Sequence, residues 1–94
     1  MSGTARSSEG LDARRRKLLF RSWHRGIREM DLILGGFADE AIATLNDAEL
    51  DQYEHLLELQ DADLLSWFTS GQSVPAAFDT QLLKKIMAFH AVAT

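Results

Sequence analysis

Apolar residues recur at intervals of three and four along almost the whole chain, which is the spacing of one face of an α-helix. No segment alternates apolar and polar residues for long enough to predict a strand. The periodicity therefore predicts an all-α protein whose helices bury their apolar stripes against one another. The longest stripe, expected in the second helix, consists of Ile27, Met30, Leu34, Phe37, Ala38, Ala41 and Ile42.

Capping signals mark where helices begin. Asp12 is placed to cap the first helix. Asn46, followed three residues later by Glu49, is a capping-box sequence that begins the third helix, with Glu49 expected on the outward face. Gly35 and Gly36 fall inside the second helix, at a cost of about 1 kcal/mol each relative to Ala. We therefore expect either that this helix bends there or that another helix packs closely against it.

Two shorter helices complete the predicted fold, a compact bundle of five short helices. Asp61 opens a fourth helix that ends at residues 70–71, and residues 72–75 form a loop. Asp79 is expected to cap the fifth helix. The apolar positions of the first, third, fourth and fifth helices are Leu18, Leu19, Trp23, Leu50, Tyr53, Leu56, Leu57, Leu64, Leu65, Trp67, Phe68, Leu82, Leu83, Ile86, Phe89 and Val92.

Length and composition are those of one small domain. The 94 residues are 46% hydrophobic and include no Cys, which excludes disulfides and thiolate metal ligands. No apolar run approaches the roughly 20 residues needed to span a bilayer, so we expect no membrane insertion. Residues 1–10 are small and polar and are predicted to be a disordered tail, while residues 11–94 form the helical-bundle domain.

The net charge of −4 conceals an uneven distribution of charge. Residues 1–28 hold eight of the ten Lys and Arg, whereas residues 29–79 hold twelve Asp and Glu and no Lys or Arg. These carboxylates would oppose a polyanion over a Debye length of roughly 8 Å, which favours a protein partner over nucleic acid. The basic run from Arg14 to Lys17 is equally consistent with a solvated face of the first helix.

Residue patterns typical of catalysis are scarce. His24, His55 and His90 lie on different predicted helices without the paired spacing of a metal site. No serine has the surroundings of a nucleophile elbow, and Gly35–Gly36 belongs to no phosphate-binding or dinucleotide-binding loop. We therefore expect no catalytic residue, no metal site and no enzyme activity.

The most distinctive local pattern is Arg-Gly-Ile-Arg-Glu-Met-Asp at residues 25–31. Gly26 permits backbone angles and close approaches that a Cβ would forbid, so the charges beside it could be brought against another surface. Arg25 and Glu29 are four residues apart, so on one continuous helix they would share a face and could simply pair. A surface ion pair and a partner-binding site are both compatible with this segment alone.

Two segments together resemble a known family. Residues 25–31 match the R-G-x-x-E-x-D signature of the SdhE-like succinate dehydrogenase assembly factors, the flavinylation factors of bacteria and mitochondria. Residues 56–67 resemble the L-L-x-x-x-D-x-D-L-x-x-W segment of that family, with Asp61, Asp63 and Trp67 at the matching positions. Tyr53 stands where many members have Phe, which is a mild departure. The resemblance covers roughly residues 14–90.

The resemblance implies an assembly chaperone. Members of the family bind the flavoprotein subunit of succinate dehydrogenase, often also that of fumarate reductase, and promote covalent attachment of FAD to a histidine of this client. Asp61 and Asp63 are secondary candidates for client contact, with helix capping the favoured interpretation, and Trp67 is expected in the core. The residues implied to bind the client are Arg25, Gly26, Arg28, Glu29 and Asp31.

Further expectations follow from the same resemblance. The chain should bind no cofactor stably, because FAD is attached to the client, and it should be a monomer. We expect it in a bacterial cytoplasm, since residues 1–10 lack the Arg-rich character of a mitochondrial presequence. Two alternatives stay open. One is a nucleic-acid-associated or antitoxin-like module that uses the basic first helix. The other is a structural bundle that homo-oligomerises through Trp23, Phe37 or Phe89.

Overall fold

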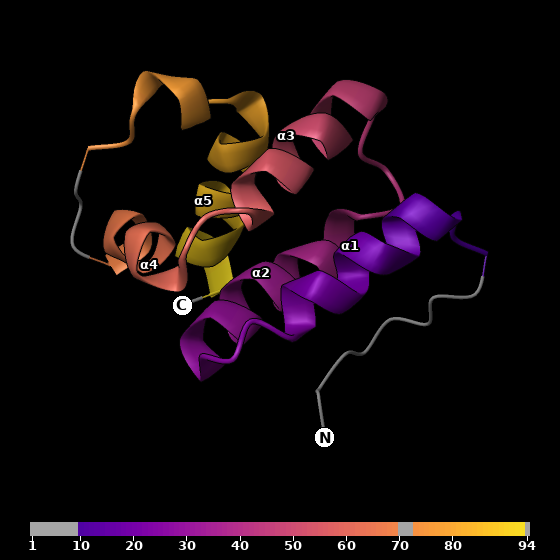
Figure 1. Ribbon diagram of the computed structural model, residues 1–94, viewed down its shortest axis with the longest axis horizontal. Coiled ribbons are helices and arrows are strands. Elements are labelled where there is room, and N and C mark those ends of the chain that lie inside the picture. Colours follow the sequence, from indigo (N-terminus) through magenta and orange to yellow (C-terminus); the bar gives the residue numbers. More distant parts are fainter. Residues whose placement is uncertain (1–9, 70–72, 94) are drawn as a thin grey trace.

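The computed structural model describes residues 10–69 and 73–93, and within these ranges the chain forms helices and no strand (Figure 1). The predicted all-α fold of five short helices is confirmed. A short 3-10 helix, which the sequence did not predict, precedes the last of them. The elements are α1 (Ala13–Trp23), α2 (Arg28–Ala41), α3 (Asp47–Leu57), α4 (Asp61–Thr69), η1 (Ala76–Phe78) and α5 (Gln81–Ala93).

Four of the helices pack closely against one another, and the fifth, α4, adds Leu64 and Trp67 to the core. Helices α1 and α5 each pack against both α2 and α3, and α4 lies beside α5, on the side of the molecule away from α1 (Figure 1). The radius of gyration is 12.4 Å, as expected for one compact domain of this length.

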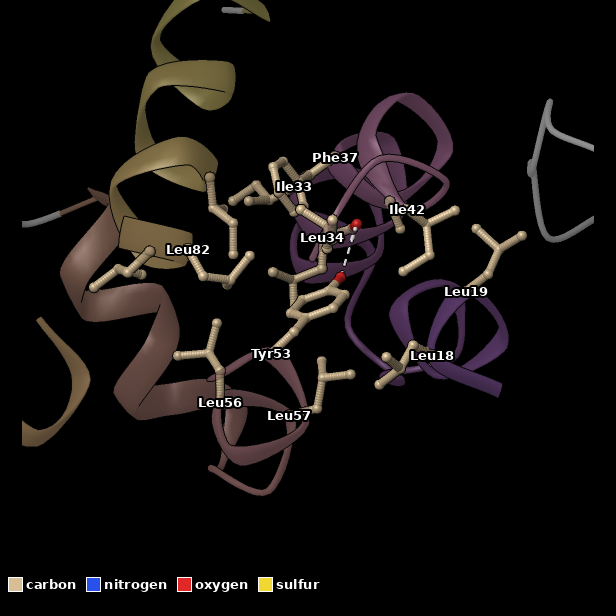
Figure 2. Packing of buried hydrophobic residues seen from close by; sticks show 14 of the residues in the cluster. Leu18, Leu19, Ile33, Leu34, Phe37, Ile42, Tyr53, Leu56, Leu57 and Leu82 are labelled. Atoms are coloured by element: carbon tan, nitrogen blue, oxygen red, sulfur yellow. Dashed lines mark hydrogen bonds between the residues drawn. The ribbon is translucent and has the colours of Figure 1, made fainter. Parts of the chain in front are cut away.

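Tyr53 lies at the centre of the core, among side chains from α1, α2, α3 and α5 (Figure 2). Its hydroxyl donates to the carbonyl oxygen of Leu34 at 3.3 Å and shares a hydrogen bond with the buried hydroxyl of Ser22. Burial raises the pKa of the Tyr53 phenol above its ordinary value, which keeps the hydroxyl protonated. Tyr at this position therefore fills the place of a core aromatic residue and satisfies two polar groups as well.

The two glycines of α2 are explained by close packing. A Cβ on Gly35 would overlap the indole ring of Trp23, at the end of α1, and a Cβ on Gly36 would lie 3.2 Å from the ring of Phe89 in α5. The indole Nε1 of Trp23 also donates to Asp39 at 3.0 Å. Of the two expectations for this pair of glycines, close approach by neighbouring helices is therefore the one confirmed.

Three described residues depart from the predicted helix faces: Ile27 and Val92, expected among the inward apolar positions, are 37% and 88% exposed, and Glu49 departs in the opposite direction. The capping box with Asn46 forms as expected, but Glu49 is 7% exposed rather than outward-facing. Its carboxylate also pairs with Lys85 of α5. The hydrogen bond from Lys85 is the main reason why the pKa of Glu49 lies below its ordinary value. Glu49 thus joins α3 to α5, a contact between distant segments that a helical periodicity does not reveal.

The beginning of α5 also differs from the prediction. Asp79 was expected as its cap, but the hydroxyl of Thr80 accepts the backbone N–H of Leu83 at 3.1 Å. The side-chain oxygen of Gln52 accepts the N–H of Leu82 at 3.3 Å. The predicted end of the fourth helix at residues 70–71 lies outside the described residues, as do residue 72 of the predicted loop and residues 1–9 of the predicted tail.

Candidate functional site

The distinctive motif at residues 25–31 spans the turn between α1 and α2. Helix α1 ends at Trp23 and α2 begins at Arg28, so the motif is not part of one continuous helix. Gly26 has a φ of +95°, in the region that side chains rarely adopt, and no atom of the described residues lies within 4 Å of where its Cβ would be. Gly26 is therefore needed for the turn itself rather than for close packing within this chain.

Arg25 points into the fold and holds the connection between α3 and α4. Its Nε donates to Oδ1 of Asp61 at 2.7 Å, and its two terminal nitrogens donate to the carbonyl oxygens of Leu57 at 2.7 Å and Leu59 at 2.6 Å. We call these four residues the Arg25 clasp. The side chains of Arg25 and Asp61 are only 11% and 16% exposed. The planar fork of a guanidinium suits such a set of acceptors, which a lysine could not match.

Asp31 fixes the other end of the motif. Its Oδ1 accepts the backbone N–H of Arg25 at 2.8 Å, across the turn that Gly26 makes. Asp31 also lies in the first turn of α2, where a carboxylate is favoured by the helix dipole. The ion pair between Arg25 and Glu29, one of the two alternatives that their spacing left open, does not form, because the turn separates them and Arg25 pairs with Asp61 instead.

The remaining polar members of the motif face solvent. Arg28 and Glu29 are exposed, and neither side chain makes a hydrogen bond or ion pair with any residue that the structure describes. Ile27 and Leu32 beside them are also exposed, at 37% and 51%. Arg28, Glu29 and Leu32 share one side of α2, because residues three and four apart are neighbours on a helix. We call Gly26, Ile27, Arg28, Glu29 and Leu32 the motif face.

The two secondary candidates have different environments. Asp61 belongs to the Arg25 clasp, where its carboxylate binds the guanidinium. Asp63, two residues later in α4, is exposed. Trp67 is buried at 8% exposure, so its predicted place in the core is confirmed. The structure thus brings Asp61 to the motif through Arg25, and it leaves Asp63 on the surface of α4.

Most of the basic side chains of α1 are engaged within the fold. Arg14 donates to Glu54 at 2.9 Å and to Asp51, and the hydrogen bond from Arg14 is the main cause that lowers the pKa of Glu54. Arg21 donates to Glu58 at 3.1 Å. Arginines of α1 thus face carboxylates of α3, so the uneven charge distribution of the sequence is partly an internal complementarity between two helices.

Arg15 is also engaged within the fold, because it donates to Asp12 and to the carbonyl oxygens of Ile42 and Leu45. Arg16 and Lys17 are the exposed members of the basic run. This pattern gives no support to a nucleic-acid-binding face on α1, because such a face needs several cations free to neutralise phosphates.

An apolar groove begins at Glu29 and was not predicted from the sequence. It has a volume of about 460 Å³ and is bounded by α2, α4 and α5. Its walls include Leu32, Leu65 and Phe89. Periodicity predicts Leu65 and Phe89 only as members of apolar stripes. Their exposed edges become visible only once the three helices are placed together.

The described residues hold neither a metal-binding cluster nor a membrane-spanning helix. Within residues 10–69 and 73–93, no group of three or more His, Asp or Glu side chains is arranged to hold a metal ion. In the same ranges no helix has the length and apolar character needed to cross a bilayer.

Comparison with known proteins places the motif in a family. The family whose model matches residues 16–90 is described as flavinator of succinate dehydrogenase. The FAD assembly factor SdhE of Acetobacter pasteurianus is 34% identical over 86 residues, which cover 92% of this chain and 79% of that protein. The mitochondrial succinate dehydrogenase assembly factor 2 of Dictyostelium discoideum is 38% identical over 76 residues, covering 81% and 54% respectively.

The corresponding mitochondrial factor of Saccharomyces cerevisiae is 36% identical over 93 residues, covering 95% of this chain and 57% of that protein. The chain thus spans little more than half the length of these two mitochondrial relatives and about four fifths of the bacterial one. The matched region includes the whole motif, the Arg25 clasp and the groove. On the extent of these matches, this chain belongs to the family of flavinators of succinate dehydrogenase.

Proposed function

We propose that this chain is an assembly factor that binds the flavoprotein subunit of succinate dehydrogenase and promotes covalent attachment of FAD to a histidine of that subunit. The observation that carries the proposal is the motif face: a guanidinium, a carboxylate and two apolar side chains, exposed and without polar partners in the described chain. The Arg25 clasp holds this face in a fixed position. A fixed surface of mixed charge suits recognition of another protein, because complementary charges set the register of the complex.

In this proposal the chain acts by binding rather than by chemistry. The motif face offers Arg28 and Glu29 but no nucleophile, and the histidine and the flavin both belong to the client. The factor then favours the client conformation in which attachment proceeds, which requires that it bind this conformation more tightly than the others. We infer accordingly that this chain is not itself an enzyme and holds no cofactor stably.

The remaining details are part of the same proposal. The bacterial relative named as an FAD assembly factor matches most of its own length to this chain, which supports action in a bacterial cytoplasm. The fumarate reductase flavoprotein is a second proposed client. The chain acts as a monomer: of the aromatic residues considered for self-association, Trp23 and Phe37 are buried within the fold.

The decisive experiment replaces the two charged residues of the motif face. Cells that lack their own assembly factor are supplied with the Arg28→Ala/Glu29→Ala double variant, and covalent flavin on the flavoprotein subunit is measured by fluorescence in denaturing gels. We expect the variant to fold normally and to fail to restore the flavin signal. The reason is that truncating one partner of a desolvated interfacial charge pair costs about 2–5 kcal/mol of binding.

The matched control is Arg16→Ala/Lys17→Ala, which removes two exposed charges from α1. This variant should restore the flavin signal as well as the wild type does. If the control fails and the Arg28/Glu29 variant succeeds, the basic helix and not the motif face carries the activity.

A further inference from the structure

The groove beside Glu29 has the form of a docking site. Its lining comes from Glu29, Leu32 and Ile33 of α2, Leu65 and Thr69 of α4, and Phe89 and His90 of α5. The first turns of α2, the helix α4 and the last turns of α5 gather at one end of the molecule (Figure 1). Among these residues Ile33 is buried, Leu65 and Phe89 are partly buried, and Leu32 is half exposed. The result is an apolar floor with an accessible rim.

The groove is continuous with the motif face. Glu29 and Leu32 belong to both, and they lie one helical turn apart on the same side of α2. A protein that covers Glu29 must therefore also cover the mouth of the groove. This continuity ties the occupant of the groove to the partner of the motif, so that one client would fill both.

The charges around the groove select the chemistry of that occupant. Glu29 is a carboxylate without an ion pair in the described chain, and it stands at the rim of an apolar floor. Arg28 does not line the groove. Among the residues that line the groove, Glu29 is the one carboxylate, none is Lys or Arg, and the one imidazole is that of His90 in α5. The complementary ligand is an apolar side chain next to a basic one.

We propose that the groove receives an apolar side chain of the flavoprotein subunit, and that a Lys or Arg beside it pairs with Glu29. This inference rests on the proposed function and extends it from a charged motif to a two-part anchor. Buried apolar anchors flanked by polar contacts are the usual source of affinity in protein interfaces. The groove would then supply most of the affinity, and Glu29 would fix which client segment enters it.

A second copy of this chain is a less suitable occupant. Phe20, with Lys17 three residues before it on α1, is an exposed apolar residue near a base. Its insertion into the groove of another copy would join two different surfaces. Such a head-to-tail contact builds an open chain of subunits unless its rotation happens to close a ring. Sedimentation of the protein alone tests this alternative.

The test compares Leu32→Glu with Leu32→Met in binding to the purified apo flavoprotein subunit of succinate dehydrogenase. Leu32 is half exposed, so both variants should fold, which circular dichroism and thermal melting verify. We expect about ten- to hundredfold weaker binding for Leu32→Glu, because it places a charge in the apolar mouth. Binding should be close to that of the wild type for Leu32→Met, which keeps an apolar chain of similar volume. Val92→Glu is the matched control, since Val92 is an 88% exposed residue of α5 that does not line the groove.

The outcomes separate this inference from the proposed function. If the wild type does not bind the subunit, the proposed function fails. If Glu29→Ala loses binding while Leu32→Glu keeps it, the function stands and the groove proposal is overturned. The groove proposal is also overturned if the protein alone sediments as an oligomer that Leu32→Glu dissociates.

A peptide array tests the chemistry of the occupant directly. Overlapping peptides that span the flavoprotein subunit are probed with the wild-type chain and with Leu32→Glu. Captured peptides should contain an apolar residue next to Lys or Arg, and capture should fall on replacing that base with Glu. Capture that ignores the base, or that Leu32→Glu leaves unchanged, would contradict the proposed two-part anchor.

Discussion

The Arg25 clasp and the motif face both include residues of the 25–31 motif but have opposite environments. Arg25 is 11% exposed, donates three side-chain hydrogen bonds into the α3–α4 connection, and receives support from Asp31. Arg28 and Glu29, only a few residues away, are exposed, and their side chains make no hydrogen bond or ion pair with a described residue. One short motif thus combines residues that hold the turn in place with residues whose side chains are exposed to solvent.

Because the two regions have different environments, substitutions in them should impair function in two different ways. A change in the clasp should reduce the stability of the protein and disturb binding only through the position of the turn. A change to an exposed side chain of the motif face, such as Arg28 or Glu29, should leave stability unaltered and act on binding alone. An assay of flavin attachment by itself would not distinguish them, so each variant needs a stability measurement beside it.

The largest loss of stability is expected from Arg25→Ala. The change leaves the Asp61 carboxylate and two backbone carbonyls without their common donor, and breaking a buried ion pair costs about 3–5 kcal/mol. Because the pair is slightly exposed, we expect about 3 kcal/mol, with Tm lowered by about 4–8 °C for each kcal/mol. Urea and thermal unfolding measure the effect, with Arg28→Ala as the control that should change stability by less than about 0.5 kcal/mol.

A double-mutant cycle sharpens this prediction. If the guanidinium and the carboxylate stabilise the fold through each other, Arg25→Ala and Asp61→Ala should be clearly less than additive. Additive losses would mean that the two residues act independently, and the contrast between clasp and motif face would then rest on the carbonyl hydrogen bonds alone.

Gly26 belongs to the motif face but also makes the turn, so changes there should have an intermediate effect on stability. Its φ of +95° makes any side chain strained there, although open space surrounds the position. Gly26→Val should cost about 1–3 kcal/mol of stability, and Gly26→Asn should cost less, because Asn tolerates positive φ. Equal unfolding midpoints for these two variants would show that backbone strain is not the role of Gly26.

Binding by Gly26 variants tests a separate property of the same position. Gly26→Arg is expected to leave the bundle folded and to abolish client binding, because the large side chain would project from the motif face. Retained binding by a folded Gly26→Arg protein would place Gly26 outside the client interface.

The smallest effect is expected from acid, through a pair in neither region. The pKa of Glu49 is held below its ordinary value of 4.5 by Lys85. A carboxylate with a lowered folded pKa contributes stability above its unfolded pKa and loses it as the pH falls through the folded value. Stability should therefore decline below about pH 4.5, and Glu49→Gln should flatten this decline without changing client binding. An unchanged acid dependence in Glu49→Gln would assign the decline to other carboxylates.

Local signals were enough to predict the helices. The stripe of α2 and the capping box at Asn46 depend on residues within one or two turns, and both are present, except that Ile27, predicted as the first residue of the stripe, precedes the helix and is exposed. The burial of Leu34, Leu57, Leu64 and Ile86 is confirmed as well, because helical periodicity identifies the inward face directly.

Contacts between segments far apart in the chain could not be predicted from the sequence. Arg25 and Asp61 are 36 residues apart, and the residues around each of them do not indicate that the two side chains form an ion pair. The burial of Glu49 depends in the same way on Lys85. The groove could not be predicted because it arises from the placement of three helices. One observation did connect the two residues of the clasp's ion pair, because Asp61 lies in one of the two segments that carry the family resemblance and Arg25 lies in the other.

Trp23 gives the protein an optical reporter of its own. The indole rests on Gly35, donates to Asp39, and ends α1 two residues before Arg25. Any change in the turn that loosens this stacking would admit water to the ring and shift its emission to longer wavelengths. With Trp67 replaced by Phe, the fluorescence of the remaining indole would therefore follow the motif turn in real time, without a label, while the client binds.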